Sequence, residues 1–189
     1  MSFMEKKPRL SFIDWLGFAR EGKASEMERI LNDYPGFNVN SIDEGGRTAL
    51  HIACEKGQDS IVSYLLAHPD IDVNQKTMNE WTPFHNVCLS GSDSCARLLL
   101  CDFRVKVNEP GKNGRTPLWC AAHNDGLDVI KRWIASGREM ELDQPGNAST
   151  DAIGEAKNKS YYMLERFKND AIKTRNEVRM ELGMTGMWF

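Results

Sequence analysis

Apolar residues recur along the middle of the chain in short groups that return at a constant distance. Within each group the apolar positions are three or four residues apart, the spacing that places side chains on one face of a helix. Three groups show this spacing most clearly: Ile61, Val62, Leu65 and Leu66; Ala96, Leu99 and Leu100; and Val129, Ile130, Trp133 and Ile134. A second apolar segment precedes each group and begins at a threonine, and Thr48, Thr82 and Thr116 are 34 residues apart. Helical patterns at a constant interval indicate stacked repeat units.

Turn and cap residues indicate where the helices of each unit begin and end. Each of the three threonines stands before alanine or proline, a combination suited to the N-cap and first position of a helix. Gly57 and Gly91 follow at the same interval, and we expect them to end the first helix in the left-handed conformation that glycine adopts without strain. Each unit is therefore predicted to hold two helices joined by a short loop.

Weaker copies of the pattern flank the three full units. Counting back 34 residues from Thr48 reaches Asp14, which suits an N-cap, and counting forward from Thr116 reaches Thr150. The end units of a stacked array expose one face to water, so we expect them to be more polar than the others. The predicted single domain, residues 1–189, divides as follows: an N-terminal cap repeat at about 10–40, full repeats at 43–75, 77–109 and 111–143, a degenerate C-terminal repeat with an extended helix at 145–182, and an apolar tail at 183–189.

The C-terminal part of the chain departs from the repeat length. Residues 161–182 contain neither proline nor glycine, which predicts one long capping helix that ends at Gly183. The following residues, 184–189, are unusually apolar. Two interpretations remain open for them: they fold back over the open end of the array, or they act as a docking or self-association element.

Residues 43–57, with the sequence DEGGRTALHIACEKG, resemble the ankyrin repeat along almost their whole length. That family has a Thr-Pro-Leu-His-x-Ala signature and a unit made of a β-turn and two antiparallel helices. The resemblance implies an all-α fold, an ankyrin-repeat solenoid of about five helix-loop-helix units with a long C-terminal capping helix. It also implies that His51 and His85, at the fourth position of the signature, hydrogen-bond the neighbouring loop. Trp119 takes this position in the third full unit.

Composition and charge limit the classes of function. The chain has 41% hydrophobic and 27% charged residues, a net charge of −3 and a pI near 5.8. This balance argues against nucleic acid as a partner, because the electrostatic attraction to phosphate is missing. No segment approaches the roughly 20 apolar residues of a membrane span, and no apolar run follows the basic residues 6–9 as it would in a signal peptide. The odd number of cysteines, five, suggests reduced thiols, so we expect a cytoplasmic or nuclear protein that binds no membrane.

No catalytic constellation is visible in the sequence. An enzyme would need a nucleophile with its base, paired carboxylates or a phosphate-binding loop, and the pair Gly45 and Gly46 fits a turn instead. Cys88, Cys95 and Cys101 are seven and six residues apart, without the close Cys-x-x-Cys pairs of structural zinc sites. We therefore expect a protein that is not an enzyme and that binds no metal and no cofactor.

The resemblance to ankyrin proteins implies that the turn tips and the first-helix face bind a partner. The predicted partner-binding residues on these surfaces are Arg47, Met78, Asn79, Glu80, Trp81, Leu89, Lys112, Asn113, Arg115 and His123. We expect Trp81, Met78 and Leu89 to form an apolar centre, since an exposed tryptophan is a preferred interface anchor. The basic residues around this centre favour a partner with an apolar anchor and some acidic character. The alternative for Trp81 is that its ring lies flat on a neighbouring loop.

A further implication of the resemblance concerns modification. Leu66, Asp72 and Val73 resemble the sequence context in which asparagines of ankyrin repeats are hydroxylated, which makes Asn74 a candidate. The alternative is that Asn74 only hydrogen-bonds its turn.

Two functions are compatible with these observations. The first is a non-enzymatic adaptor or inhibitor that binds another protein or peptide through the turn tips and the concave first-helix face. The second is a non-catalytic regulatory or targeting subunit of an enzyme complex, docked through the C-terminal helix and tail. We expect a monomer, with self-association through the tail as the alternative.

Overall fold

The computed structural model describes residues 12–142, 152, 156 and 158–184. This part of the chain contains α-helices, one 3-10 helix and no strand. The helices are α1 (Phe12–Glu21), α2 (Ala24–Asp33), α3 (Ala49–Lys56), α4 (Asp59–Leu66), α5 (Pro83–Ser90), α6 (Asp93–Cys101), η1 (Lys112–Gly114), α7 (Pro117–His123), α8 (Leu127–Ser136), α10 (Asn158–Asn169) and α11 (Ala171–Glu181).

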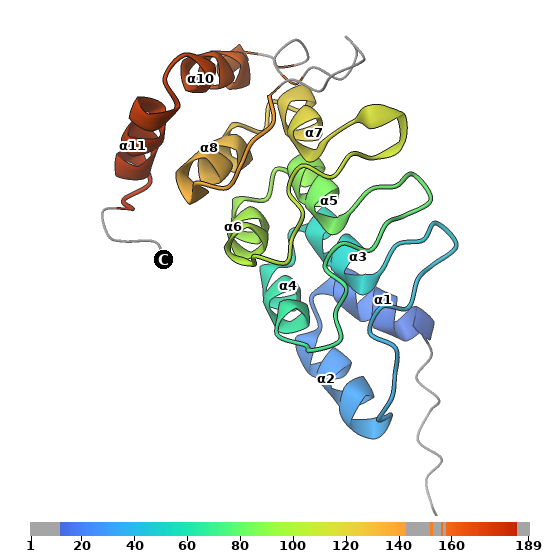
Figure 1. Ribbon diagram of the computed structural model, residues 1–189. Helices are drawn as coiled ribbons and strands as arrows, with labels where there is room; N and C mark the ends of the chain where they lie inside the picture. The colour runs from blue at the N-terminus through green and yellow to red at the C-terminus, as the bar shows by residue number, and fades with distance from the viewer. Residues whose placement is uncertain (1–11, 143–151, 153–155, 157, 185–189) are drawn as a thin grey trace, which may run out of the picture.

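The helices stack in two rows that run along the array (Figure 1). In one row α1, α3, α5 and α7 lie side by side, and in the other α2, α4, α6 and α8 do the same, each helix packed against the next. Hairpin loops lead from α2 to α3, from α4 to α5 and from α6 to α7, and they project on the side of the first row (Figure 1). The predicted all-α repeat solenoid is confirmed.

Local sequence explains where the central helices begin and end. Thr48 Oγ1 accepts a hydrogen bond from the His51 N–H (3.4 Å), and Thr116 Oγ1 accepts one from the Trp119 N–H (3.1 Å), so both threonines are N-caps. Gly57 ends α3 with a φ of 67°, in the left-handed region where glycine is free of strain. The predictions for these caps are confirmed.

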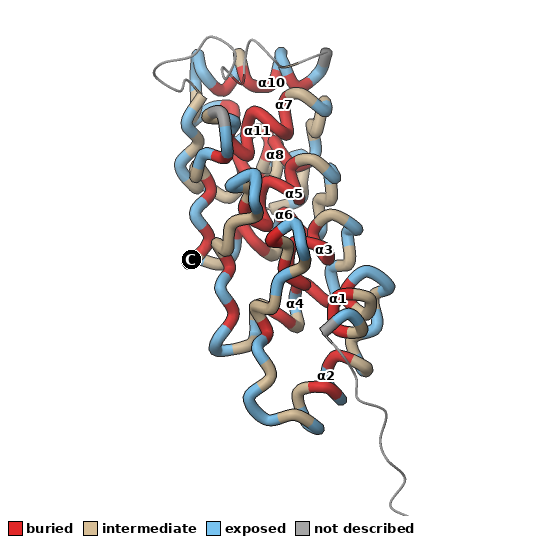
Figure 2. Tube along the Cα trace, turned by 90° about the vertical axis from the view of Figure 1, so that its right-hand side faces the viewer, coloured by how far each residue is buried: buried red, intermediate tan, exposed pale blue. Residues whose placement is uncertain are grey.

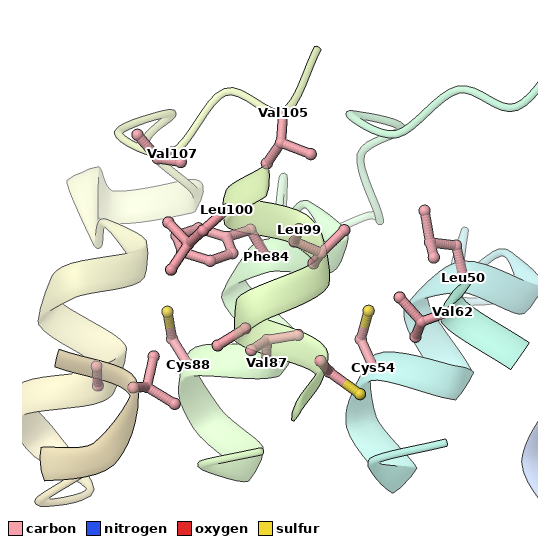
Figure 3. Packing of buried hydrophobic residues seen from close by; sticks show 14 of the residues in the cluster. Leu50, Cys54, Val62, Phe84, Val87, Cys88, Leu99, Leu100, Val105 and Val107 are labelled. Carbon is pink, nitrogen blue, oxygen red and sulfur yellow. The ribbon is translucent and has the colours of Figure 1, made fainter. Parts of the chain in front are cut away.

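The two rows enclose one core that continues from unit to unit (Figure 2). Side chains of successive units interdigitate there: Leu50 and Cys54 of α3 approach Phe84 and Val87 of α5 (Figure 3). Burial raises the pKa of the Cys54 thiol well above its ordinary value, so this cysteine stays protonated and behaves as a small apolar residue.

Three asparagines with the 34-residue interval fasten each hairpin to the next. Asn74 donates through Nδ2 to the Arg104 carbonyl (2.8 Å) and accepts through Oδ1 from the Lys106 N–H (2.8 Å). Asn40 and Asn108 make the same two contacts with the units that follow them. The Asn74 amide is thus engaged between units, and these contacts support a structural role for it.

Arginines close the C-terminal ends of the second helices. Arg104 donates to the Leu66 carbonyl of α4 (2.8 Å), and Arg138, 34 residues later, donates to the Leu100 carbonyl of α6 (3.4 Å). Carbonyls in the last turn of a helix have no partner within the helix, so each arginine satisfies a group of the preceding unit. The sequence contained this pair at the repeat interval, and our sequence analysis did not use it.

The single long capping helix predicted over 161–182 is wrong, because the chain breaks into α10 and α11 at Asp170. Asp170 has an extended backbone (φ −150°, ψ 87°), and its carboxylate accepts a hydrogen bond from the Lys173 N–H (2.9 Å), which makes it the N-cap of α11. A single helix over 161–182 would be about 33 Å long, whereas α8 has ten residues. The break lets α10 and α11 both pack on α8, and from α11 Arg179 donates to the Ala135 carbonyl of α8 (2.8 Å).

Two other expectations concern the ends of the array. α1 begins at Phe12, so Asp14 lies in its first turn and is not its N-cap as predicted; Phe12 and Ile13 contain nothing that stops a helix from starting earlier. The predicted start of the last unit at Thr150 and the tail at 185–189 lie outside the described residues.

Candidate partner-binding surface

The tips of the three hairpins join edge to edge. The Met78 N–H donates to the Gly45 carbonyl (3.0 Å), and the Lys112 N–H donates to the Asn79 carbonyl (2.9 Å). Seven of the predicted binding residues, from Arg47 to Arg115, lie on or beside these tips. The backbone bonds hold them as one continuous edge beside the row of first helices (Figure 1).

The second hairpin carries the most apolar tip. The Met78 side chain is 72% exposed, and Asn79 and Glu80 are also exposed. Glu80 has a φ of 59°, whereas Gly46 and Gly114 occupy this turn position in the neighbouring hairpins. A left-handed non-glycine residue costs about 1 kcal/mol or more, so the chain keeps a carboxylate at this tip in spite of strain.

Trp81 is half-buried and lies on the neighbouring hairpin. A Cβ added to Gly111 would stand 2.5 Å from Trp81 Cδ1 and 2.9 Å from its Nε1, so the ring covers the glycine closely. The other contact is with His85, whose ring is parallel to the indole with centroids 6.1 Å apart. This geometry is the alternative considered for Trp81, a ring laid on a loop, and it leaves part of the indole in contact with solvent.

Replacing Gly111 with alanine should displace the Trp81 ring, because the new methyl group would overlap it. We expect a red shift of the Trp81 fluorescence and a modest loss of stability, about 1–2 kcal/mol. A Gly111→Ala, Trp81→Ala double variant, in which the clash is absent, should regain part of the loss relative to Trp81→Ala alone. An unchanged emission spectrum in Gly111→Ala would contradict the placement of the ring.

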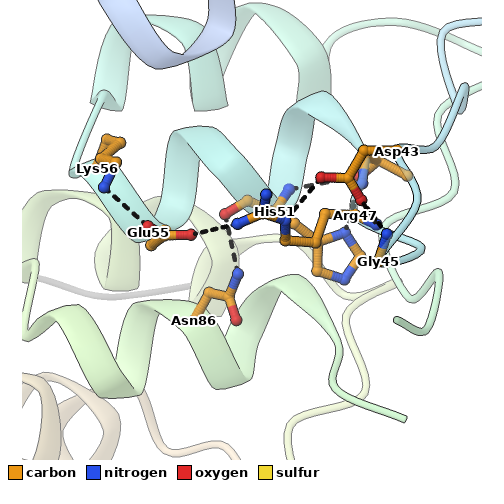
Figure 4. A network of polar contacts seen from close by, with 8 residues as sticks. Asp43, Gly45, Arg47, His51, Glu55, Lys56 and Asn86 are labelled. Atoms are coloured by element: carbon orange, nitrogen blue, oxygen red, sulfur yellow. Dashed lines mark hydrogen bonds and ion pairs between the residues drawn. The ribbon is translucent and has the colours of Figure 1, made fainter. Parts of the chain in front are cut away.

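The first hairpin is held by a network of charges (Figure 4). Arg47 pairs with Asp43 (Nε to Oδ2, 2.8 Å) and with Glu55 (Nη1 to Oε2, 3.4 Å). Partial burial would raise the pKa of Asp43, but hydrogen bonds from Arg47 and from the Gly45 N–H outweigh it and hold the pKa below its ordinary value. We expected Arg47 to supply a free positive charge to the rim, and this expectation is wrong because carboxylates of its own unit neutralise it.

The third hairpin is basic. Lys112 and Arg115 are exposed and form no salt bridge with any other described residue. The Arg115 guanidinium lies 4.3 Å from the centre of the Trp119 ring, and the His123 ring stacks on the other neighbour of this column with centroids 4.8 Å from Trp119. The side chain of Asn113 lies outside the described part of the structure. Positive charge is therefore concentrated at this end of the edge.

The first-helix face below the tips is mostly polar. Leu89, near the C-terminal end of α5, is half-buried and packs against the core. About 10 Å of helix separates it from Trp81, so the predicted apolar centre is stretched along α5 and is not a compact cluster. Asn86 lies between them and donates to the His51 carbonyl of the preceding unit (3.1 Å), as Figure 4 shows.

The two buried histidines have structural positions. His51 Nδ1 accepts from the Thr48 N–H (3.2 Å), so Nε2 carries the proton and donates to the Trp81 carbonyl (3.0 Å). His85 bonds the Arg115 carbonyl in the same way (3.1 Å). Burial lowers the pKa of each ring from its ordinary 6.5 to about 4. The predicted bonds to the neighbouring loops are confirmed.

Other chemistry was sought in the described residues. No group of three or more His, Cys, Asp or Glu side chains in that part of the chain is arranged to hold a metal ion. Among the same residues, no helix has the length and apolar character needed to cross a membrane.

The sequence model of the family described as ankyrin repeats, in three copies, matches residues 17–77 and 67–143, about two thirds of the chain. The chain is an ankyrin-repeat protein. Ankyrin repeats generally mediate interactions between proteins, and proteins built from them are typically not enzymes. The chain has no match among curated proteins.

One feature of the ankyrin array was missed by sequence reasoning. Beside the first hairpin lies a hollow of about 350 Å³, lined by residues of α1 that include Ile13, Leu16 and Gly17. Its sequence signal is a glycine in the middle of α1 next to an exposed isoleucine. The weak repeat pattern at this end hid which side of α1 faces the hairpin.

Proposed function

We propose that the protein is a non-enzymatic adaptor or inhibitor that holds a segment of another protein against its hairpin tips and first-helix face. The observation that carries the proposal is the continuous edge of the three tips, with exposed Met78 at its centre and unpaired Lys112 and Arg115 at one end. An apolar anchor beside a concentrated charge is typical of specific binding surfaces. The partner segment has an apolar side chain over Met78 and Trp81 and an acidic group toward the third hairpin.

Binding of short random peptides displayed on phage, selected on the whole chain, tests the proposal. Met78→Ser should weaken the selected peptides about tenfold, and Trp81→Ala should weaken them by about 1–2 kcal/mol. Lys112→Glu should weaken peptides with acidic residues by several-fold and raise the dissociation rate less than it lowers the association rate. Titration calorimetry and surface plasmon resonance measure these changes.

Phe103→Ser is the matched control. Phe103 is 89% exposed and follows α6, away from the tips, so its loss should leave the affinity unchanged. Equal binding to wild type, Met78→Ser and Trp81→Ala would reject the tips as the binding surface, provided that circular dichroism shows the fold intact.

A second candidate function is that of a non-catalytic subunit docked through the C-terminal helices. Exposed Ile172 and Met180 on α11 favour it, since large apolar side chains in water often mark interfaces. In that case Ile172→Ser and Met180→Ser would abolish assembly with the enzyme partner while the peptides above bind as before.

A further inference from the structure

The hollow beside the first hairpin lies between one face of α1 and the next unit. Ile13, Leu16, Gly17 and Arg20 are spaced three or four residues apart and so share that face. Leu16 and Ile52 of α3 form a buried floor, and Ile13 is 71% exposed at the opening. An isoleucine exposed next to a buried apolar floor leaves apolar surface that a partner side chain is able to cover.

Gly17 keeps the hollow open. A Cβ added there would meet no atom within 4 Å, although the residue lies in the middle of a helix where glycine is unfavourable. In the next two units the first helix fills the space toward the following hairpin with His51 and His85. α1 contains no histidine, and Leu16 and Gly17 are its residues in the hollow that faces Asp43 and Glu44 of the hairpin.

The hairpin does not need a side chain from α1 to satisfy its backbone. The Arg47 carbonyl, the counterpart of those that His51 and His85 bond, accepts from the Asp43 N–H (3.0 Å). The space is therefore free for another molecule without leaving a carbonyl unsatisfied there.

The rim of the hollow carries opposite charges at its two ends. Asp43 is already paired with Arg47, which leaves Glu44 on the hairpin side and Arg20 at the C-terminal end of α1 without a salt bridge to any described residue. About 10 Å of helix separates the levels of Ile13 and Arg20. A ligand with a positive group toward Glu44 and a negative group toward Arg20 would complement both.

We infer that this hollow, which we call the Gly17 socket, binds one aliphatic or aromatic side chain of the partner segment, with a basic residue on one side of that side chain and an acidic residue on the other. The inference rests on the proposed function and adds a second anchor to it. Met78 and Trp81 hold one part of the segment, and the socket at the first unit holds another. The charged rim orients the segment along the array.

Filling the socket tests the inference without weakening the fold. Gly17→Leu places an apolar side chain in open space and replaces a helix-interior glycine, so the melting temperature should stay the same or rise. The phage-selected peptides should lose at least about tenfold in affinity, because the buried side chain is displaced. Gly17→Ala, which adds one methyl group, should cause a smaller loss, and Glu44→Lys should weaken peptides whose flanking residue is basic.

Three outcomes separate the inference from the proposed function. Loss of affinity in both Gly17→Leu and Met78→Ser, with Phe103→Ser unchanged, supports the socket. Full affinity in Gly17→Leu together with loss in Met78→Ser overturns the socket and leaves the proposed function standing. Peptides that ignore both variants, or a library that yields no binder to the folded chain, overturn both.

Discussion

Trp133→Ala is expected to lower the free energy of unfolding by about 3–5 kcal/mol. Trp133 is fully buried in α8. Its ring meets that of Phe84 from α5 edge-on, with centroids 5.0 Å apart, and its Nε1 donates to the Glu139 carbonyl (3.2 Å). Alanine would leave a large cavity and an unpaired carbonyl at the same place. Urea denaturation followed by circular dichroism measures the loss.

The position of Trp133 makes a second effect measurable. α8 packs against α6, α7, α10 and α11, so it joins the central units to the C-terminal helices. Repeat arrays are held by contacts between neighbours, and a weakened contact lets one part unfold before the rest. Amides of α10 and α11 should therefore exchange with deuterium at lower urea concentrations than those of α3 and α5, a separation that wild type should show less. A loss below about 1 kcal/mol, close to that of a partly exposed residue, would contradict the packing described for α8.

The central units were predictable because each of their signals is local. Thr48 and Thr116 set helix starts through bonds to residues three positions away, and Gly57 sets an end through its own backbone. The break at Asp170 was not predictable in this way. Without proline or glycine, the local sequence permits a continuous helix, and only the need to pack both α10 and α11 on α8 favours the break.

The candidate site shows the same division. The sequence placed Met78 at a tip, but whether Arg47 is a free charge depends on Asp43 and Glu55, which reach it only in the folded hairpin. Trp81 depends on Gly111, thirty residues away, since only a glycine admits the ring so closely. Side-chain partners across units decide which exposed residues remain free to bind, and a single sequence does not contain that pairing.

Acidification from pH 7 to 5 is expected to destabilise the protein through His51 and His85. The pKa of each buried ring is about 4, against an ordinary value of 6.5. Below pH 6.5 the unfolded chain takes up a proton at each histidine, whereas the folded chain does so only near pH 4. The unfolded state therefore binds more protons in this window, and stability falls as the pH falls through it. The full effect is roughly 3 kcal/mol per histidine, reached near pH 4.

Carboxylates contribute in a lower window and do not obscure this effect. The pKa values of Asp43 and Glu55 lie below their ordinary 3.8 and 4.5, so their contribution is lost as the pH falls through about 4.5 and below. Between pH 6.5 and 5 the slope of stability against pH, measured by urea denaturation, should therefore come largely from the two buried rings. His85→Gln, which retains an N–H donor for the Arg115 carbonyl, should lower stability at pH 7 and reduce that slope by about half. An unchanged slope in the His51→Gln, His85→Gln double variant would show that the rings are not held neutral, because a group that cannot titrate cannot transmit a pH dependence.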